Sequence, residues 1–424
     1  MYHQIFHIGN VVFYVLLAIG VLLLLQKIIY HIVGLFPAKK FKDAKQNHKF
    51  AILIPARNES KVIEQLLISI EEQNYDKNLL KTYVIVESED DPTCDIAKRY
   101  ANTEVFVRRH LENKGKGHAL DEVVTEIFSR GEEYDAFFIF DADNVLDKNY
   151  IKEMNNAFDA GYEIALGYRN SKNWDDGWVA SSSALTFSMI NTFQNKCRSR
   201  FTKNVIISGT GFYVSKNVLK KAGGWKFFEL TEDYELSMYA ALNNVKATYN
   251  EYAEFYDEQP KKLKVSWNQR LRWVKGFSKV SKKYRKKLVK SLIYDKQNRL
   301  CKFEYVVSVL PIVVMLAVSF AYTIFTLVLG IVGSIIGDPV CVDVYMACII
   351  SSLAIYFFFV MYAFVMLLAE RKHIKMKFWH KVSCCLMFPI YMALYIPIYI
   401  QAMFKKEVEW KPIEHSVNMK KDKA

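Results

Sequence analysis

The sequence predicts an α/β domain with a mainly parallel sheet, attached to several long apolar helices. Two observations support this prediction. First, β-rich runs alternate with helical patterns between about residues 49 and 275, and such alternation gives parallel strands with helices on both faces of the sheet. Second, apolar runs long enough to cross a bilayer flank this segment. We therefore expect a membrane protein with a large aqueous domain inserted after its first helix.

The predicted strands and helices alternate along the aqueous segment. Ligands of parallel sheets bind beyond the carboxyl ends of the strands. The stretches PARNES, ESEDD and DADN all fall at such ends, so three loops are expected to point polar groups at one crevice. The strands are predicted at 50–56, 82–87, 104–109 and 136–143, and the helices at about 60–73, 93–101 and 117–129.

The first apolar run is predicted to be a membrane anchor. It is too long for a cleavable signal peptide, no small-residue cleavage site follows it, and positive charge lies after it. Residues 1–10 contain no Lys or Arg, whereas several lysines follow the run, so the positive-inside rule places the aqueous domain in the cytoplasm of a multi-pass cell-membrane protein. The apolar runs are 11–36, about 305–336, 342–369 and 383–404.

The last apolar run leaves two topologies open. If residues 383–404 cross the membrane, the chain after them lies outside, although it and the stretch before the run are basic. Alternatively, Pro389 and Pro397 bend the run into a re-entrant or interfacial segment packed on protein. Tail residues such as Trp410 and His415 would then reach the cytoplasmic domain. The charge pattern favours this second arrangement.

The basic residues gather beside the membrane segments. The formal net charge is +13, and the stretch 261–290 interleaves lysines and arginines with Trp, Phe, Val and Leu. This pattern is typical of a helix on anionic headgroups, so we expect the bilayer, and no nucleic acid, to be the partner of this charge. The seven cysteines lack the paired CxxC spacing of zinc sites and are expected to be structural thiols.

Two carboxylates follow the fourth predicted strand in the stretch FIFDADN. Asp141 and Asp143 would reach into the crevice, where hard oxygen ligands of this kind hold Mg²⁺ or Mn²⁺ against a diphosphate. A turn with solvated aspartates explains an isolated DAD equally well. The stretches further along the chain favour the metal site.

The stretch LTEDYELSMY, residues 230–239, gathers acidic residues in a basic chain. It predicts a helix start, with the Thr231 hydroxyl as cap and with Glu232, Asp233 and Glu235 near the positive end of the helix dipole. Downstream, residues 267–276 read WNQRLRWVKG. Guanidinium groups pair with phosphate oxygens and an indole face stacks on a sugar ring, although a membrane-surface helix would show the same residues.

The order IPARNE, DAD, TED and QRLRW resembles the membrane-embedded family 2 glycosyltransferases, such as bacterial cellulose, hyaluronan and poly-N-acetylglucosamine synthases. The resemblance runs from about residue 50 to 276. It implies a glycosyltransferase A-type, Rossmann-like fold and inverting transfer from a UDP-sugar to a growing polysaccharide that passes through the membrane helices. Single-sugar transfer to a lipid and a non-catalytic membrane scaffold or exporter are the alternatives. The fold alone does not distinguish an enzyme from a scaffold. The intact motifs favour an enzyme.

The resemblance also implies roles for individual residues. Asp233 matches the base that deprotonates the acceptor, with Glu232 beside it in TED, and Asp143 matches the direct ligand of Mg²⁺ or Mn²⁺. Glu87 stands where the family has aspartate, and Asp91 matches the second acid of that loop. Acceptor contacts are expected from Ser208, Gly209, Thr210 and Trp273. Donor contacts are expected from Pro55, Ala56, Arg57, Glu59, Glu87, Lys116, Asp141, Asp143, Gln269, Arg270, Arg272 and Trp273.

These predictions divide the chain into five parts. They are an N-terminal transmembrane helix at 1–38, a cytoplasmic glycosyltransferase domain at 39–276, an amphipathic interfacial region at 277–304, C-terminal membrane helices at 305–404 and a basic tail at 405–424.

Overall fold

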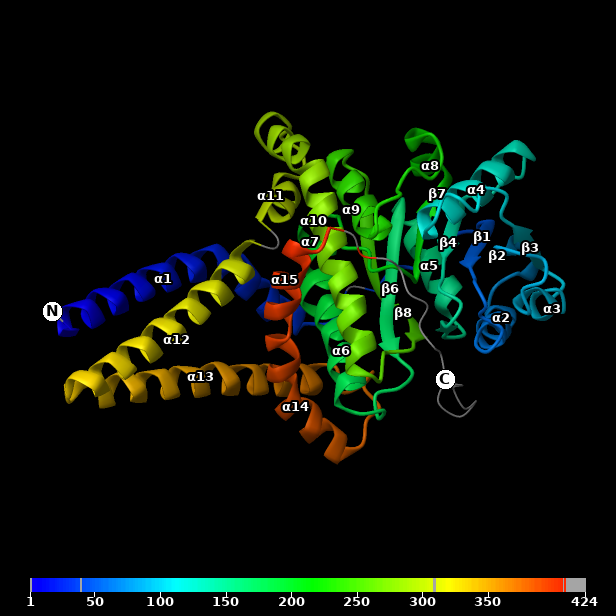
Figure 1. Cartoon of the computed structure of the whole chain (residues 1–424). Helices are drawn as coiled ribbons and strands as arrows, with labels where there is room; N and C mark the ends of the chain where they lie inside the picture. Colours follow the sequence, from blue (N-terminus) through cyan, green and yellow to red (C-terminus); the bar gives the residue numbers. More distant parts are fainter. Residues whose placement is uncertain (1, 39, 308–309, 407, 409–424) are drawn as a thin grey trace.

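The computed structural model describes residues 2–38, 40–307, 310–406 and 408, and its centre is one eight-stranded sheet (Figure 1). The strand order is β3-β2-β1-β4-β7-β6-β8-β5. The strands are β1 (Phe50–Pro55), β2 (Leu80–Val86), β3 (Thr103–Val107), β4 (Ala136–Ile139), β5 (Val145–Leu146), β6 (Ile164–Ser171), β7 (Phe212–Ser215) and β8 (Ala247–Asp257).

The first half of the sheet is parallel, as the sequence predicts. β1 pairs with β2 and β4, and β2 pairs with β3, all in parallel register. The four predicted strands and the three predicted helices are all present, so the expected α/β class is confirmed.

The second half of the sheet was not predicted. β7 runs antiparallel to both β4 and β6, whereas β8 runs parallel to β6. Two reversals restore the direction, so β6 and β8 point the same way as β4. Their carboxyl ends therefore lie at the same edge of the sheet as the ends of β1, β2 and β4, and the loop that enters β7 lies there too.

Two apolar layers cover the two faces of the sheet. Leu120, Val123 and Leu236 belong to one buried layer, while Leu66 and Met154 belong to the other. The alternation of side chains along each strand feeds both layers. The first layer is covered by α4 (Lys116–Ser129), α8 (Lys216–Ala222) and α9 (Glu232–Leu242), and the second by α2 (Ile63–Glu71), α3 (Thr93–Ala97) and α5 (Tyr150–Asp159), with a short turn η1 (Lys77–Leu79) before β2.

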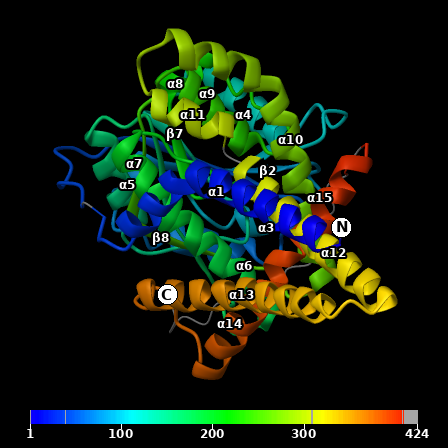
Figure 2. The same ribbon diagram turned by 90° about the vertical axis from the view of Figure 1, so that its left-hand side faces the viewer.

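Three long apolar helices project from the sheet domain: α1 (Tyr2–Gly34), α12 (Leu310–Ile336) and α13 (Val340–Ala369) (Figures 1 and 2). α12 packs against both α1 and α13. Within the described residues, four helical stretches are long and apolar enough to cross a membrane: His3–Leu22, Val318–Ile336, Cys341–Ala369 and Phe378–Phe404.

The last apolar stretch lies against the sheet domain. It consists of α14 (Phe378–Ala393), which contains Pro389, and α15 (Tyr395–Phe404). α14 packs on α6 (Trp178–Met189), which continues through a π-helical turn η2 (Ile190–Asn195) into α7 (Lys196–Phe201), and α15 packs on α10 (Leu263–Tyr294). A re-entrant segment would need such contacts, but whether the stretch crosses the membrane stays a prediction. Trp410 and His415 lie outside the described residues.

Helix α10 is continuous across the predicted boundary between residues 276 and 277. Its second half and α11 (Arg299–Val307) expose apolar side chains, including Ile293, Tyr294 and Phe303, among lysines. The placement of this surface on lipid headgroups stays a prediction.

Candidate active site

Lys116 joins three segments at the carboxyl edge of the sheet. Its ammonium group lies 2.5 Å from Asp141 Oδ1 and donates to the Gly209 carbonyl at 2.7 Å. Lys116 begins α4, Asp141 follows β4, and Gly209 precedes β7. The structure thus brings together three predicted site residues that are up to 93 positions apart in sequence.

Glycines fix the start of α4. Gly115 has φ 117°, a left-handed conformation that favours glycine. A Cβ on Gly117 would lie 2.1 Å from the Phe227 carbonyl oxygen, so α4 approaches the loop between α8 and α9 as closely as only glycine allows. Burial disfavours the Lys116 ammonium, but the carboxylates of Asp141 and Glu232 outweigh burial and raise the pKa of Lys116.

The loop before β7 depends on glycine for a similar reason. Gly209 and Gly211 have φ 83° and 67°, and a Cβ on Gly211 would lie 2.1 Å from the Phe255 ring. A Cβ on Gly209 would lie 3.8 Å from Asp233 Oδ2. The predicted acceptor loop therefore passes directly beside the predicted base.

The two aspartates after β4 have different surroundings. The Asp141 backbone N–H donates to Thr210 Oγ1 at 2.8 Å, while its carboxylate faces Lys116. Asp143 is buried, and its oxygens accept from Asn144 Nδ2 and from the Glu258 N–H, each at 3.2 Å. The described residues contain no group of three or more metal-ligating side chains. One or two carboxylates nevertheless fit Mg²⁺ or Mn²⁺, because such ions take their other ligands from phosphates and water.

The predicted helix start at residues 231–235 is correct, but the predicted hydroxyl cap is wrong. α9 begins at Glu232, and the Thr231 hydroxyl has no hydrogen-bond partner among the described residues. A Cβ on Gly276 of α10 would lie 2.5 Å from Thr231 Cγ2, so tertiary packing decides the position of the threonine. Glu235 instead accepts from the Phe228 and Glu229 N–H groups and fixes the chain entering the helix.

Glu232, which is buried, and Asp233, which is half-buried, form an acidic pair next to Lys116. Burial raises the pKa of Glu232 to about 7, and the Asp233 carboxylate adds to this shift. Burial also raises the pKa of Asp233, against the opposing charges of Lys116 and Arg272. A carboxyl group with a raised pKa is a stronger base than an exposed one, which suits proton abstraction.

The first two loops pair with each other. Arg57 Nε lies 3.0 Å from Glu87 Oε2, just after Pro55 and Ala56 at the end of β1. The Glu59 N–H donates to Thr93 Oγ1 at 3.0 Å.

Asp91, the second acid of that loop, accepts from the Asn58 and Thr93 N–H groups at 2.8 and 2.9 Å. Asp91 therefore holds the first loop against the start of α3, a role that needs no ligand.

The basic and aromatic residues of α10 divide between two sides of the helix. Arg272 Nη1 donates to the Leu230 carbonyl at 2.9 Å, next to the acidic pair. Gln269, three positions before Arg272, and Trp273, four positions after Gln269, are half-buried and lie on the same side of the helix.

Arg270, which the sequence predicts to contact the donor, lies away from the other predicted donor residues. It is fully buried, donates to the Tyr391 carbonyl at 2.9 Å and stacks on Tyr391, so it faces α14 instead of the site.

The structure adds residues that no motif predicted. Arg169 at the end of β6 donates to Asp257 at the end of β8 and to the Ser208 carbonyl. Knowledge that 164–171 and 247–257 are strands would have placed both at this edge, but neither stretch was predicted to be a strand.

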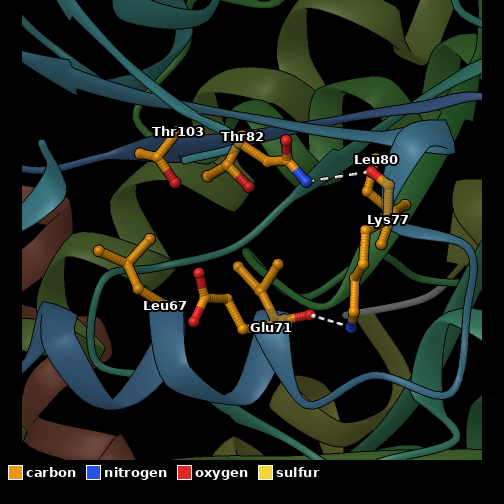
Figure 3. Close-up of a pocket in the computed structure, with 8 residues that line it drawn as sticks. Leu67, Glu71, Lys77, Leu80, Thr82 and Thr103 are labelled. Carbon is orange, nitrogen blue, oxygen red and sulfur yellow. Dashed lines mark hydrogen bonds between the residues drawn. The ribbon is translucent and has the colours of Figure 1, made fainter. Parts of the chain in front are cut away.

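A separate small pocket lies at the opposite end of the strands (Figure 3). Its volume is about 20 Å³, room for roughly one water molecule. Thr82 and Thr103, near the amino ends of β2 and β3, line it together with Leu67 and Lys77. It is too small for a nucleotide sugar and plays no part in the site.

Comparisons with known proteins agree with this arrangement. The model of the family described as glycosyltransferase-like family 2 matches residues 48–276, more than half of the chain. The probable glycosyltransferase YdaM of Bacillus subtilis (strain 168) is 29% identical over 280 residues, which are 60% of this chain and 63% of YdaM. A beta-monoglucosyldiacylglycerol synthase of Trichormus variabilis is 23% identical over 236 residues, 53% of this chain and 48% of the relative. The chain thus matches less than two thirds of either relative.

Among solved structures, the mannosyltransferase PcManGT from Pyrobaculum calidifontis, in complex with GDP-Man and Mn²⁺, has a TM-score of 0.57 and 14% identity. The match covers 94% of this chain and 100% of PcManGT, so it confirms the glycosyltransferase A-type fold. The family match, together with the sheet that brings the DAD, TED and QRLRW stretches to one edge, shows that this chain belongs to family 2 of the glycosyltransferases.

Proposed function

We propose that this glycosyltransferase moves a sugar, with inversion, from a UDP-sugar to a hydroxyl group of a growing polysaccharide at the membrane. One observation supports this most strongly: Lys116 places the acid pair of α9 next to Asp141, so a base and a diphosphate-binding strand end share one site.

The chemistry follows from the position of Asp233. The acceptor oxygen attacks the anomeric carbon, its proton passes to the Asp233 carboxylate, and the bond from that carbon to the diphosphate oxygen breaks with release of UDP. Attack opposite the leaving group inverts the anomeric centre. A general base of this kind contributes about 10²- to 10⁴-fold to the rate.

Cationic side chains would stabilise the departing diphosphate. Lys116 and Arg272 both lie close enough to the acid pair to affect its charge, and both can reach phosphate oxygens when a donor replaces their present partners. When bound at Asp143, Mg²⁺ or Mn²⁺ would neutralise charge on the leaving group. These groups act electrostatically, and no covalent enzyme intermediate is needed.

The membrane arrangement is part of the proposal. The lysines after α1 favour a cytoplasmic position for the sheet domain, and the product would leave through the apolar helices. For residues 383–404 we favour the re-entrant arrangement. A single cysteine at Lys420, in a chain without native cysteines, should resist a membrane-impermeant maleimide in intact cells. Labelling without permeabilisation would show that this stretch crosses the membrane.

A lipid acceptor is the second candidate. The relative from Trichormus variabilis is named as a synthase of a glucosyl diacylglycerol, and the site here adjoins apolar helices. A single addition to a lipid would need the same base and the same donor side, so the two candidates differ in the acceptor alone.

The test uses the purified full chain in detergent with a panel of UDP-sugars, Mg²⁺ or Mn²⁺, and either oligosaccharide or diacylglycerol acceptors. Released UDP reports transfer, and product mass reports the number of sugars added. A ladder of products supports polysaccharide synthesis, and one added sugar on the lipid supports the second candidate. Absence of UDP release with every donor and acceptor would contradict both.

A further inference from the structure

A largely buried arginine, Arg169, connects three parts of the predicted acceptor side. Arg169 Nε donates to Asp257 Oδ2 at 2.6 Å, and Nη2 pairs with the same carboxylate. Arg169 Nη1 donates to the Ser208 carbonyl at 2.7 Å. The guanidinium face lies 3.7 Å from the centre of the Phe187 ring. All of these partners lie on different elements: β8, the loop before β7, and α6.

The alternation of β6 explains why Arg169 points toward the site. Its neighbours Tyr168 and Asn170 point the other way, where Tyr168 donates to Glu370 at 2.9 Å and Asn170 to Glu254 at 2.6 Å. Successive strand side chains face opposite sides of a sheet, so Arg169 must face the side with Ser208.

Asp257 is itself satisfied on both oxygens. Gln259 Nε2 donates to its Oδ1 at 2.8 Å, while its Oδ2 accepts from Arg169. The carboxylate is almost fully buried, with 3% of its side-chain surface exposed, so it fixes the guanidinium in one orientation.

The aromatic contact extends this arrangement to α10. The Phe187 and Trp273 rings meet edge to face at 84°, with centres 5.7 Å apart. Phe187 is buried, and its other side is covered by Arg169. The orientation of the Trp273 indole therefore depends on Phe187, and that of Phe187 on Arg169.

We propose that Arg169 is a positioning residue for the acceptor: through Phe187 it orients the Trp273 indole, and through the Ser208 carbonyl it fixes the loop beside Asp233. This inference rests on the proposed function, in which Trp273 and the 208–210 loop hold the acceptor. It assigns no contact between Arg169 and the donor. Most of the predicted donor ligands lie at Lys116 and on the loops after β1, β2 and β4, although Trp273 is expected to contact the donor as well as the acceptor.

The Arg169→Lys variant distinguishes a positioning role of Arg169 from a simple ion pair with Asp257. A lysine would keep the charge opposite Asp257, but it has no planar group that can donate in its plane and stack on a ring with its face. A structural ion pair would thus tolerate Arg169→Lys, whereas a positioning residue would not.

The experiment compares Arg169→Lys and Phe187→Leu with the wild type in the full chain. We expect Arg169→Lys to raise the acceptor KM about five- to tenfold, the size of a lost aromatic contact, and to change the donor KM less than twofold. Phe187→Leu keeps the hydrogen bonds to Ser208 and should raise the acceptor KM alone. The double variant should cost less than the product of the two single effects, because both act through Trp273.

A second measurement does not depend on turnover. In protein carrying 5-fluorotryptophan, the resonance of Trp273 is identified by its loss in Trp273→Phe, and both variants should shift it. Arg130→Lys, in an exposed arginine paired with Glu104 and Glu126, serves as control and should change neither the resonance nor either KM.

Two outcomes would overturn the proposal. One is an Arg169→Lys variant with an unchanged acceptor KM and an unshifted Trp273 resonance. The other is an equal rise in donor and acceptor KM. If Arg169→Lys does not fold, Phe187→Leu decides by the same criteria. A wild type without any transfer would refute the proposed function, while the fluorine shift still tests the positioning.

Discussion

The donor side and the acceptor side of the site contain ion pairs that differ in solvent exposure. The two sides meet at the loop of residues 208–210. On the donor side the pairs are partly exposed: the Lys116 and Asp141 side chains are 20% and 43% exposed, and those of Arg57 and Glu87 are 54% and 35% exposed. On the acceptor side, the Arg169 and Asp257 side chains are 11% and 3% exposed. Each side donates a hydrogen bond to this loop: Arg169 to the Ser208 carbonyl and Lys116 to the Gly209 carbonyl.

The exposure of these ion pairs indicates how each side responds to a ligand. Exposed ion pairs contribute little to stability, so a charged ligand can replace one partner at small cost. A buried pair cannot lose a partner without a large penalty. We therefore expect the donor side to exchange its pairs for the nucleotide diphosphate, and the acceptor side to keep its geometry throughout the reaction.

The largest expected effect comes from the residue between the two sides. Asp233→Asn keeps the shape of the side chain and removes the base, so kcat should fall about 10²- to 10⁴-fold while the Kd for UDP stays within a few-fold. Stopped assays of UDP release and calorimetry of UDP binding measure the two quantities. Substantial turnover by the purified variant would remove Asp233 from the role of base.

The donor side is tested next through Asp143. Asp143→Ala at ordinary metal concentrations should lower kcat/KM by about 10²- to 10³-fold, the loss typical of one preorganised electrostatic group, and EDTA should abolish wild-type activity. Glu112→Ala removes an exposed carboxylate elsewhere and serves as control. Full activity after complete chelation would make the aspartates after β4 structural.

The two arginines of QRLRW give a third test. Arg272→Ala removes a cation beside the acid pair and should lower kcat about 10- to 100-fold, the size of one hydrogen bond to a charged group, with little change in thermal stability. Arg270→Ala should instead lower the melting temperature, because Arg270 stacks on Tyr391 and Tyr395 beneath α14 and α15. A catalytic defect in a stable Arg270→Ala protein would restore Arg270 to the donor site.

Sequence reasoning could have separated these arginines. Residues two apart on an α-helix are related by a rotation of about 200° about the helix axis and point to nearly opposite sides. Arg270 and Arg272 therefore cannot both face one site. The prediction assigned both arginines to the donor from the QRLRW motif and did not take the helical rotation between them into account. In contrast, the hydroxyl cap at Thr231 failed for a reason that only the fold reveals, the close approach of Gly276 from α10.

Strands β6 and β8 were also not predictable from local sequence. β1 to β4 are short apolar runs and were predicted, whereas β6 and β8 end in polar residues that resemble loops. The side chains of Asn170 and Glu254 bond to each other across these strands. Buried polar groups are stable when they find partners, and partners 84 positions apart cannot be read from a local pattern.

The smallest expected effect concerns the acid pair and pH. Burial raises the pKa of Glu232 from its ordinary 4.5 to about 7, so the folded protein binds this proton more tightly than the unfolded chain. The stabilising effect of that proton is complete below pH 4.5 and is lost as the pH rises through about 7, a change of at most about 3 kcal/mol.

Glu232→Gln stays neutral at every pH, so its melting temperature should fall less than that of the wild type between pH 5 and 8. Glu112→Gln, at an exposed carboxylate, should follow the wild type. Equal slopes in Glu232→Gln and the wild type would show that Glu232 is not the group that titrates, and that burial on this side of the site costs less than the structure implies.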